Sequence, residues 1–277
     1  MNTPFGNSVT TAEHAIAMMF AVARQLPEAS VSTHAGKWEK SRFMGTEITG
    51  KTLGLIGCGN IGTIVAERAQ GLKMRVVGYD PFLSPENATR LGIEKLELDE
   101  LLARADFITL HTPLTDATRN IISADALNKT KKGVRIVNCA RGGLVDELAL
   151  FAALTSGHVA GAALDVFAEE PATDNPLFGA PNFIATPHLG ASTREAQEKV
   201  ALQVAEQMAD YLNASISEVQ SYELRQKNLM AINTIEFIDG QLIQIESALR
   251  DSETALKEFR SENLIVDLSS ESAQMLE

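Results

Sequence analysis

The sequence is poor in cysteine, in basic residues and in long apolar runs, and each shortage excludes a class of protein. Two cysteines among 277 residues cannot build a disulfide scaffold or a four-cysteine zinc site, so no metal site is expected. No apolar run reaches the roughly 18–20 residues that a bilayer-crossing helix needs, so no membrane span is expected. The N-terminus lacks the basic segment and apolar core of a secretory signal. Together these absences predict a cytoplasmic location.

The shortage of basic residues leaves the chain acidic. Lys and Arg number 24 against 36 Asp and Glu, a formal net charge of −12. A nucleic-acid backbone would repel such a chain, so we expect no nucleic-acid partner. The acidity is uneven, because residues 214–277 carry a net charge of −7 and contain one glycine (Gly240) and no proline. We therefore predict a boundary near Asn213.

A hydrophobic fraction of 45% is sufficient for a sizeable core, and the order of apolar segments predicts its architecture. Near-continuous apolar strands separated by helices are typical of an α/β fold with a doubly wound parallel sheet. Strands are predicted at residues 52–57, 75–80, 107–111, 135–140, 161–167 and 182–186, and helices at 61–72, 97–104, 123–129 and 146–156.

Two further helices are predicted on either side of this region. A buried helix over residues 8–26 is expected to be capped by Thr10 or Thr11 and ended by Pro27. A helix over residues 192–212 begins with Ser192 as its expected N-cap, with Glu195 three residues later.

The acidic tail has a heptad pattern. Its a positions are Ile235, Leu242, Leu249 and Leu256, and its d positions are Ala231, Ile238, Ile245, Ser252 and Phe259. This spacing predicts a coiled coil or a helical hairpin. The alternative is a lone amphipathic helix lying on the main domain.

A glycine motif at the first strand–helix turn points to a dinucleotide. Gly57, Gly59 and Gly62 form G-x-G-x-x-G, in which the glycines allow a tight turn, close approach of a pyrophosphate, and helix–strand packing. Asp80 ends the next strand, where a carboxylate binds ribose hydroxyls and repels a 2′-phosphate. The pattern predicts a Rossmann-type domain that prefers NAD to NADP. The alternative is a glycine-rich turn in an unrelated α/β domain.

Three polar residues follow later strands and are expected at the same crevice. Arg141, Glu170 and His188 suit hydroxy-acid oxidation: His188 as proton acceptor, Glu170 stabilising the imidazolium, and Arg141 holding a carboxylate. Taken singly, each could equally be an ordinary loop or helix-entry residue. The other histidines, His14, His34, His111 and His158, are expected to be structural, and Cys139 to be a packing residue beside the cofactor.

Residues 1–213 resemble the D-isomer-specific 2-hydroxyacid dehydrogenases, through NTPFGNSVTTAEHAIAMM, TLGLIGCGNIG, HTPLTDATRNII, VNCARGGLVDELAL, AALDVFAEEP and TPHLGASTREAQ. The resemblance implies that Arg141, Glu170 and His188 are catalytic. It implies that Asp165 meets the nicotinamide carboxamide, and that Thr112 and Pro113 flank the adenine-ribose side. The full implied set of NAD contacts is Gly57, Gly59, Asn60, Ile61, Gly62, Asp80, Thr112, Pro113, Cys139, Ala140, Arg141, Asp165, His188, Gly190 and Ala191.

The same resemblance implies an activity and an assembly. The likeness is greatest to members that oxidise 3-phosphoglycerate to 3-phosphohydroxypyruvate, the entry to serine biosynthesis. The alternatives are a glyoxylate or hydroxypyruvate reductase and a non-enzymatic NAD-binding module. A homodimer through the cofactor domain is expected.

The resemblance also predicts how the chain is divided. Residues 1–50 would be a helical crossover from a truncated substrate domain, 51–190 the NAD-binding domain, 191–213 a helix returning to the substrate domain, and 214–277 a helical tail. A fragment of this kind is expected to bind NAD but to turn over weakly or not at all. The tail is similar to the extracytoplasmic helical region of polysaccharide-export chain-length regulators and their tyrosine-kinase relatives. We therefore expect a chimeric reading frame.

Overall fold

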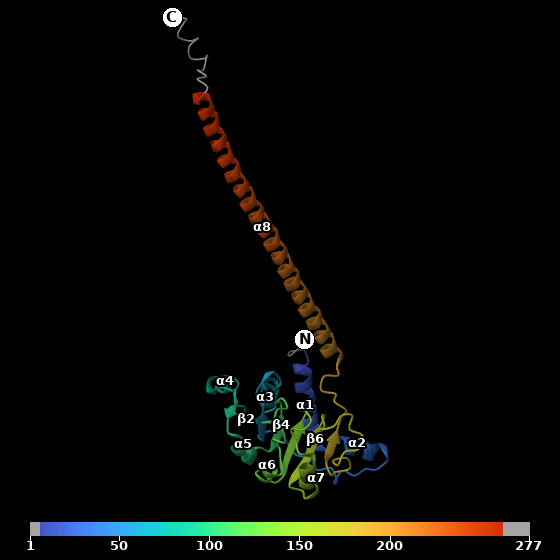
Figure 1. The fold of residues 1–277 in the computed structure, drawn as a ribbon. Coiled ribbons are helices and arrows are strands. Elements are labelled where there is room, and N and C mark those ends of the chain that lie inside the picture. The colour runs from blue at the N-terminus through green and yellow to red at the C-terminus, as the bar shows by residue number, and fades with distance from the viewer. Residues whose placement is uncertain (1–5, 263–277) are drawn as a thin grey trace. The chain divides into compact units, whose positions relative to one another are not determined.

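The computed structural model describes residues 6–262, which divide into two units near Glu206. The first unit is built on a parallel sheet of seven strands in the order β3-β2-β1-β4-β5-β6-β7 (Figure 1). The order reverses between β1 and β4, and this reversal confirms the Rossmann-type prediction. The strands are β1 (Thr52–Ile56), β2 (Arg75–Tyr79), β3 (Glu94–Lys95), β4 (Phe107–Leu110), β5 (Val134–Asn138), β6 (Val159–Leu164) and β7 (Phe183–Ala185).

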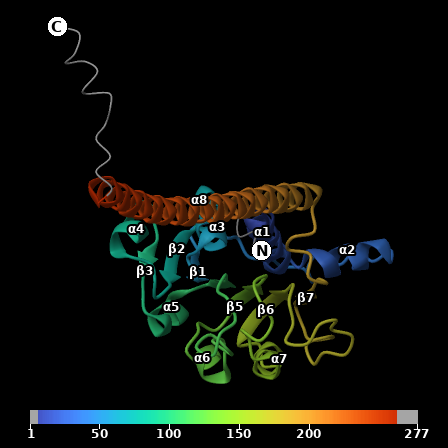
Figure 2. The ribbon, with the colours of Figure 1, turned by 45° about the horizontal axis from the view of Figure 1, so that its top comes forward.

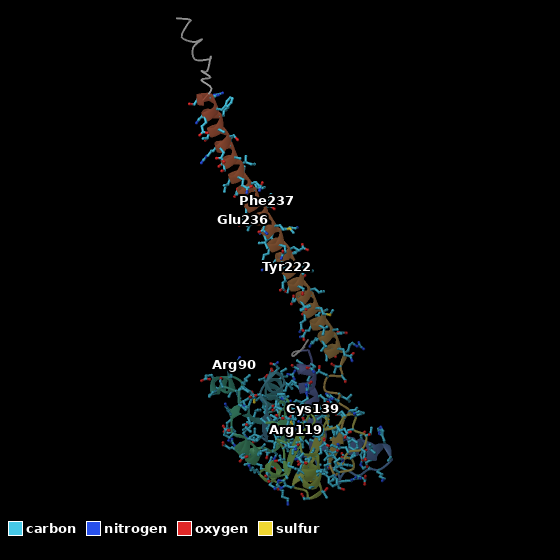
Figure 3. All side chains as sticks on the ribbon, viewed as in Figure 1. Arg90, Arg119, Cys139, Tyr222, Glu236 and Phe237 are labelled. Atoms are coloured by element: carbon cyan, nitrogen blue, oxygen red, sulfur yellow. The ribbon has the colours of Figure 1, made fainter. Side chains whose placement is uncertain are left out.

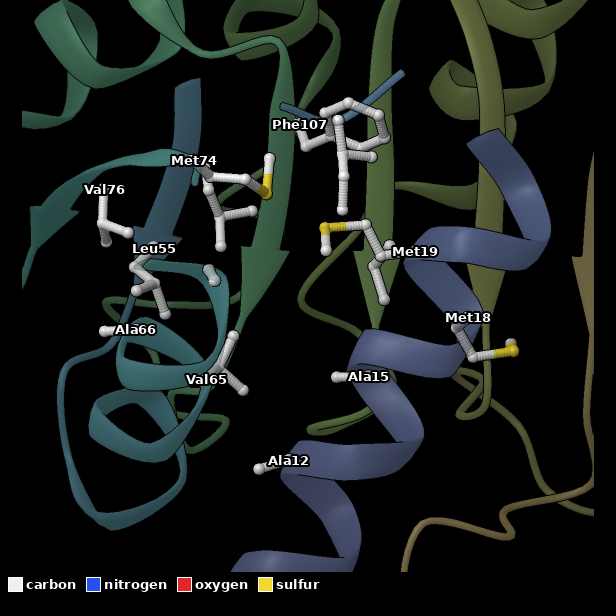
Figure 4. Packing of buried hydrophobic residues seen from close by; sticks show 14 of the residues in the cluster. Ala12, Ala15, Met18, Met19, Leu55, Val65, Ala66, Met74, Val76 and Phe107 are labelled. Carbon is white, nitrogen blue, oxygen red and sulfur yellow. The ribbon is translucent and has the colours of Figure 1, made fainter. Parts of the chain in front are cut away.

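Helices cover both faces of the sheet, and each face has its own apolar core (Figure 2). On one face, α1 (Ser8–Arg24) packs beside α3 (Asn60–Gly71), with Ala12 and Ala15 directed toward Val65 (Figure 4). The other face is covered by α5 (Leu98–Arg104), α6 (Ala124–Asn128) and α7 (Glu147–Thr155). Every residue of β1 and β4 is buried, as expected for central strands covered on both sides.

The first helix begins at Ser8 as predicted, but its capping residue and its C-terminal end differ from the prediction. It ends at Arg24, because Gln25 adopts a left-handed conformation with φ of 53° and donates its N–H to the carbonyl of Ala21. Pro27 does not end this helix; it lies in the first turn of α2 (Leu26–His34), where its missing N–H costs nothing. Thr10 and Thr11 lie inside α1 and do not cap it, since Asn7 occupies the N-cap position. The pattern also did not predict α2, α4 (Pro85–Arg90) or β3.

The last helix, α8 (Arg194–Glu262), begins two residues after the predicted cap. Thr193 caps it and Ser192 does not, because the Thr193 Oγ1 accepts the N–H of Ala196 at 3.2 Å. The helix continues without a turn, so the predicted hairpin is wrong over residues 214–262. The coiled-coil alternative and the origin of the tail stay predictions, and residues 263–277 of the predicted tail lie outside the described residues. Over residues 6–262, no helix has both the length and the apolar character required to cross a membrane.

Candidate functional site

The glycine turn after β1 leaves open space at the start of α3. A Cβ on Gly57, whose φ is 96°, would lie 2.6 Å from the His111 carbonyl, and one on Gly62 would lie 2.1 Å from the Gly57 oxygen. Both positions therefore require glycine. A Cβ on Gly59 would meet nothing within 4 Å, so the space above this residue is free. This cradle fits a pyrophosphate resting on the N-terminus of α3.

Asp80 is held beside that turn. Its Oδ2 accepts the N–H of Cys58 at 2.8 Å, and its Oδ1 accepts the N–H of Phe82 at 2.8 Å. With Gly59 and Asn60 it lines a cavity of about 420 Å³. The carboxylate thus lies where the motif places the ribose hydroxyls. Together, the open glycine turn and this carboxylate fit NAD.

A second cavity, of about 340 Å³, lies at the carboxyl ends of the strands. Residues from several strand ends meet there, as the sequence predicted for a doubly wound sheet. Its lining includes these predicted positions: Ile61, Thr112, Pro113, Cys139, Ala140, Arg141, His188, Gly190 and Ala191.

Glu170 and His188 form a pair, and of the two His188 lines this cavity. The His188 Nδ1 lies 2.7 Å from the Glu170 Oε2, and the Glu170 Oε1 accepts the N–H of Phe167 at 3.0 Å. Burial raises the pKa of the Glu170 carboxyl, but the bonds from His188 and Phe167 outweigh it and lower the pKa below its usual value. Glu170 is therefore ionised at neutral pH. It fixes the ring so that the Nε2 edge faces away from the carboxylate.

Arg141 is positioned by a residue that the sequence pattern did not single out. Asn138 is 1% exposed; its Nδ2 donates to the Arg141 carbonyl at 2.9 Å and its Oδ1 accepts the Ala140 N–H at 3.0 Å. A Cβ on Gly142 would lie 1.6 Å from the Phe167 carbonyl oxygen, so this turn packs directly on the segment leading to Glu170. The sequence feature that could have identified Asn138 is an amide side chain at the end of an apolar strand.

Asp165 holds the loop that carries His188. Its carboxylate is fully buried and accepts the N–H groups of Leu189 and Gly190, each at 2.7 Å, and the Thr186 hydroxyl at 2.5 Å. Burial raises the pKa of Asp165, but hydrogen bonds with His14 and Thr186 and from the two backbone N–H groups together lower it below its usual value. Its contact with a nicotinamide carboxamide stays a prediction; the hydrogen bonds show that it positions the loop.

Helix α1 reaches the same loop. The His14 Nε2 lies 3.3 Å from the Asp165 Oδ1 and 3.4 Å from the Thr186 Oγ1. The Thr11 hydroxyl donates to the Gly190 carbonyl at 3.0 Å. His14 therefore contacts the groups that hold the His188 loop, and no local sequence signal links positions so far apart along the chain.

Burial keeps His111 and the two cysteines neutral at physiological pH. Burial lowers the pKa of His111 to about 3, and its Nε2 lies 2.9 Å from the Thr109 Oγ1. Burial likewise raises the pKa of the Cys58 thiol to about 12 and raises that of Cys139. Among the described residues, no group of three or more His, Cys, Asp or Glu is arranged to hold a metal ion.

Comparison with known proteins identifies this architecture. Residues 16–190 match the family model for the D-isomer specific 2-hydroxyacid dehydrogenase, NAD binding domain. The chain is 49% identical over 211 residues to a D-3-phosphoglycerate dehydrogenase of Bacillus subtilis, covering 76% of this chain and 40% of the relative. It is 52% identical over 210 residues to the Rattus norvegicus protein of the same name, covering 76% and 39%. The chain therefore spans about 40% of the length of these curated relatives.

Solved structures agree with this match. A glyoxylate reductase from Paecilomyes thermophila is 39% identical with a TM-score of 0.68, over 72% of this chain and 61% of that one. A D-lactate dehydrogenase from Aquifex aeolicus, complexed with NAD and lactic acid, is 28% identical with a TM-score of 0.70, over 79% and 71%. The chain belongs to the D-isomer specific 2-hydroxyacid dehydrogenases and contains their NAD-binding domain.

Proposed function

We propose that this chain binds NAD at the strand ends and uses Arg141, Glu170 and His188 to oxidise a D-2-hydroxy acid, with 3-phosphoglycerate as the substrate. The 2.7 Å contact between the His188 Nδ1 and the Glu170 Oε2 carries the proposal, since it aligns a proton acceptor beside the cavity that Arg141 lines. The relatives named D-3-phosphoglycerate dehydrogenase support this choice of substrate.

The glycine turn and Asp80 would hold the cofactor. Backbone N–H groups at the start of α3 would bind the pyrophosphate, and the Asp80 carboxylate would accept hydrogen bonds from the ribose hydroxyls. A 2′-phosphate there would meet a negative charge, which favours NAD over NADP. When bound, NAD supplies the acceptor for the hydride that leaves the substrate carbon.

His188 then takes the hydroxyl proton as the carbon loses its hydride, and returns it in the reverse reaction. The ionised Glu170 stabilises the imidazolium that forms and keeps the Nε2 edge turned away from itself. Arg141 would hold the substrate carboxylate through its planar guanidinium, with its backbone fixed by Asn138. The product is the 2-keto acid, which is 3-phosphohydroxypyruvate for 3-phosphoglycerate.

Reduction of keto acids by the purified chain tests this proposal. NADH consumption, which we expect to be slow, is followed with 3-phosphohydroxypyruvate, hydroxypyruvate, glyoxylate and pyruvate, and the first should react fastest. His188→Ala should lower the rate by about 100-fold or more while NAD binding persists. His34→Ala, a change at an exposed residue of α2, is the matched control and should leave both unchanged. Faster reduction of glyoxylate would reassign the substrate, and a rate unaffected by His188→Ala would overturn the mechanism.

The first unit is also proposed to pair with a second copy. Its segment from α2 to the first strand exposes large apolar side chains: Leu26 (52%), Val31 (71%), Trp38 (86%) and Met44 (85%). Such a concentration is typical of an interaction surface. Trp38→Arg should reduce the mass measured by sedimentation if this surface pairs, and an unchanged mass would refute that pairing.

A further inference from the structure

The second unit exposes a continuous apolar seam that the dehydrogenase chemistry does not use. Along α8, every a and d position from Ile235 to Leu249 is a large aliphatic residue, and Leu256 follows one heptad later (Figure 3 shows this helix with its side chains). These side chains are between 49% and 62% exposed. A helix with so regular a 3.5-residue repeat buries its seam against other helices.

We propose that residues 231–256 form a parallel bundle of three or four copies of this chain. The number of strands follows from which residue type occupies each position. Ile235, Leu242, Leu249 and Leu256 occupy a, and Ile238 and Ile245 occupy d. Isoleucine at both positions, like leucine at a with isoleucine at d, favours three or four strands, whereas β-branched residues at a with leucine at d favour two.

Small residues at the g positions support a bundle larger than a pair. Ala248 and Ala255 lie at g, beside the a positions, and widen the apolar face beyond the narrow seam of a two-stranded coil. A wider face is what a helix needs when it contacts two neighbours. The charged residues of this segment lie outside that face.

Charge favours the parallel orientation. Asp239, Glu246 and Glu253 occupy successive e positions, while the g positions Gln241 and Ala248 are neutral. In a parallel bundle, e residues of one helix lie beside g residues of the next, so these carboxylates meet no like charge. An antiparallel overlap of the seam would place e beside e and bring carboxylates together.

Cysteine cross-linking of the full chain tests the orientation. Ser252 lies at d and Ser247 at the outward f position of the same helix. In a parallel bundle, Ser252→Cys should form disulfide-linked pairs under mild oxidation, because d residues lie beside their own copies. Ser247→Cys is the matched control and should link at least ten-fold more slowly. Equal linking of the two variants, or none by Ser252→Cys, would overturn the parallel bundle. The two native cysteines are buried and give the same background in both.

Sedimentation equilibrium tests the number of strands. The full chain should form particles of three or four copies, or larger if the first unit also pairs. The combined exchange Leu242→Ile, Leu249→Ile, Ile238→Leu and Ile245→Leu keeps the apolar content but should lower the number of copies held by the tail to two. Ile238→Asp with Ile245→Asp should abolish tail association while NAD binding persists. A wild-type mass equal to that of the aspartate variant would overturn the proposal, and a tail dimer in the wild type would overturn the strand number.

Discussion

Replacing the buried carboxylate of Asp165 by an amide tests how much this side chain stabilises the loop that carries His188. Asp165 accepts bonds from two backbone N–H groups and one hydroxyl in a fully buried position. In Asp165→Asn, one of these donors faces an NH₂ group that cannot accept. A buried backbone N–H left unpaired costs about 1–3 kcal/mol, and hydrogen bonds to charged groups contribute about 1.5–3 kcal/mol each. We expect a loss of about 3 kcal/mol in the free energy of unfolding.

The loss should appear as a lower midpoint of thermal unfolding. For a unit of this size, 1 kcal/mol corresponds to roughly 2–4 °C, so Asp165→Asn should unfold about 6–12 °C earlier. Near-ultraviolet circular dichroism follows packed aromatic rings, which in the first unit include Phe107 and Phe167, and does not report the backbone helicity of the tail. The hydride-transfer rate should fall as well, because the loop that carries His188 loses its anchor.

Asp174→Asn is the matched control for this change. Asp174 lies exposed on a loop, so its substitution should shift the unfolding free energy by less than about 0.5 kcal/mol. The pH dependence adds a second check. Because the pKa of Asp165 is lowered, its stabilisation is complete above about pH 5 and is lost as the pH falls through the folded-state value. Equal stability of Asp165→Asn and Asp174→Asn would refute the positioning role.

Three further predictions concern the crevice. Gly62→Ala should abolish NAD binding measured by calorimetry, because its Cβ would collide with the Gly57 oxygen, whereas Gly71→Ala, which meets nothing within 4 Å, should bind normally. Asp80→Ser should narrow the preference for NAD over NADP at least ten-fold by removing the charge that repels a 2′-phosphate; an unchanged ratio of dissociation constants would contradict this. His111 is neutral in the folded state and takes up a proton on unfolding below pH 6.5. The free energy of unfolding should therefore fall by up to about 1.4 kcal/mol per pH unit as the pH is lowered from 6.5 to about 3. In urea titrations, His111→Gln should reduce this pH dependence.

The sheet was predictable because each of its long strands carries a near-continuous apolar run. β1 and β4 are buried on both faces, and the glycine turn that follows β1 marks the strand–helix junction independently. The two-residue strand β3 carries no periodicity and depends on its pairing with β2. The continuity of α8 could have been predicted from its composition. One glycine and no proline after residue 213 leave no turn signal in this segment, so the hairpin prediction had no support in the sequence.

The candidate site also has a part that the sequence predicts and a part that it does not. Arg141, Glu170 and His188 could be found because each follows a predicted strand and parallel strands end at one edge. The contacts of His14 and Asn138 could not, because they depend on tertiary packing: His14 reaches Thr186 from 172 positions away. The predicted cap of α8 was wrong for a local reason. Ser192 and Thr193 are both of a residue type that caps helices, and the Thr193 hydroxyl is the one that accepts the N–H of Ala196.

The central proposal is that the crevice between the glycine turn and His188 binds NAD. Titration calorimetry of the full chain with NAD and with NADP, on the wild type and on Gly62→Ala, tests it most directly. The proposal predicts one NAD per chain, at least ten-fold weaker binding of NADP, and no binding of either by Gly62→Ala. NAD binding that survives in Gly62→Ala, or equal affinity of the wild type for both dinucleotides, would contradict it.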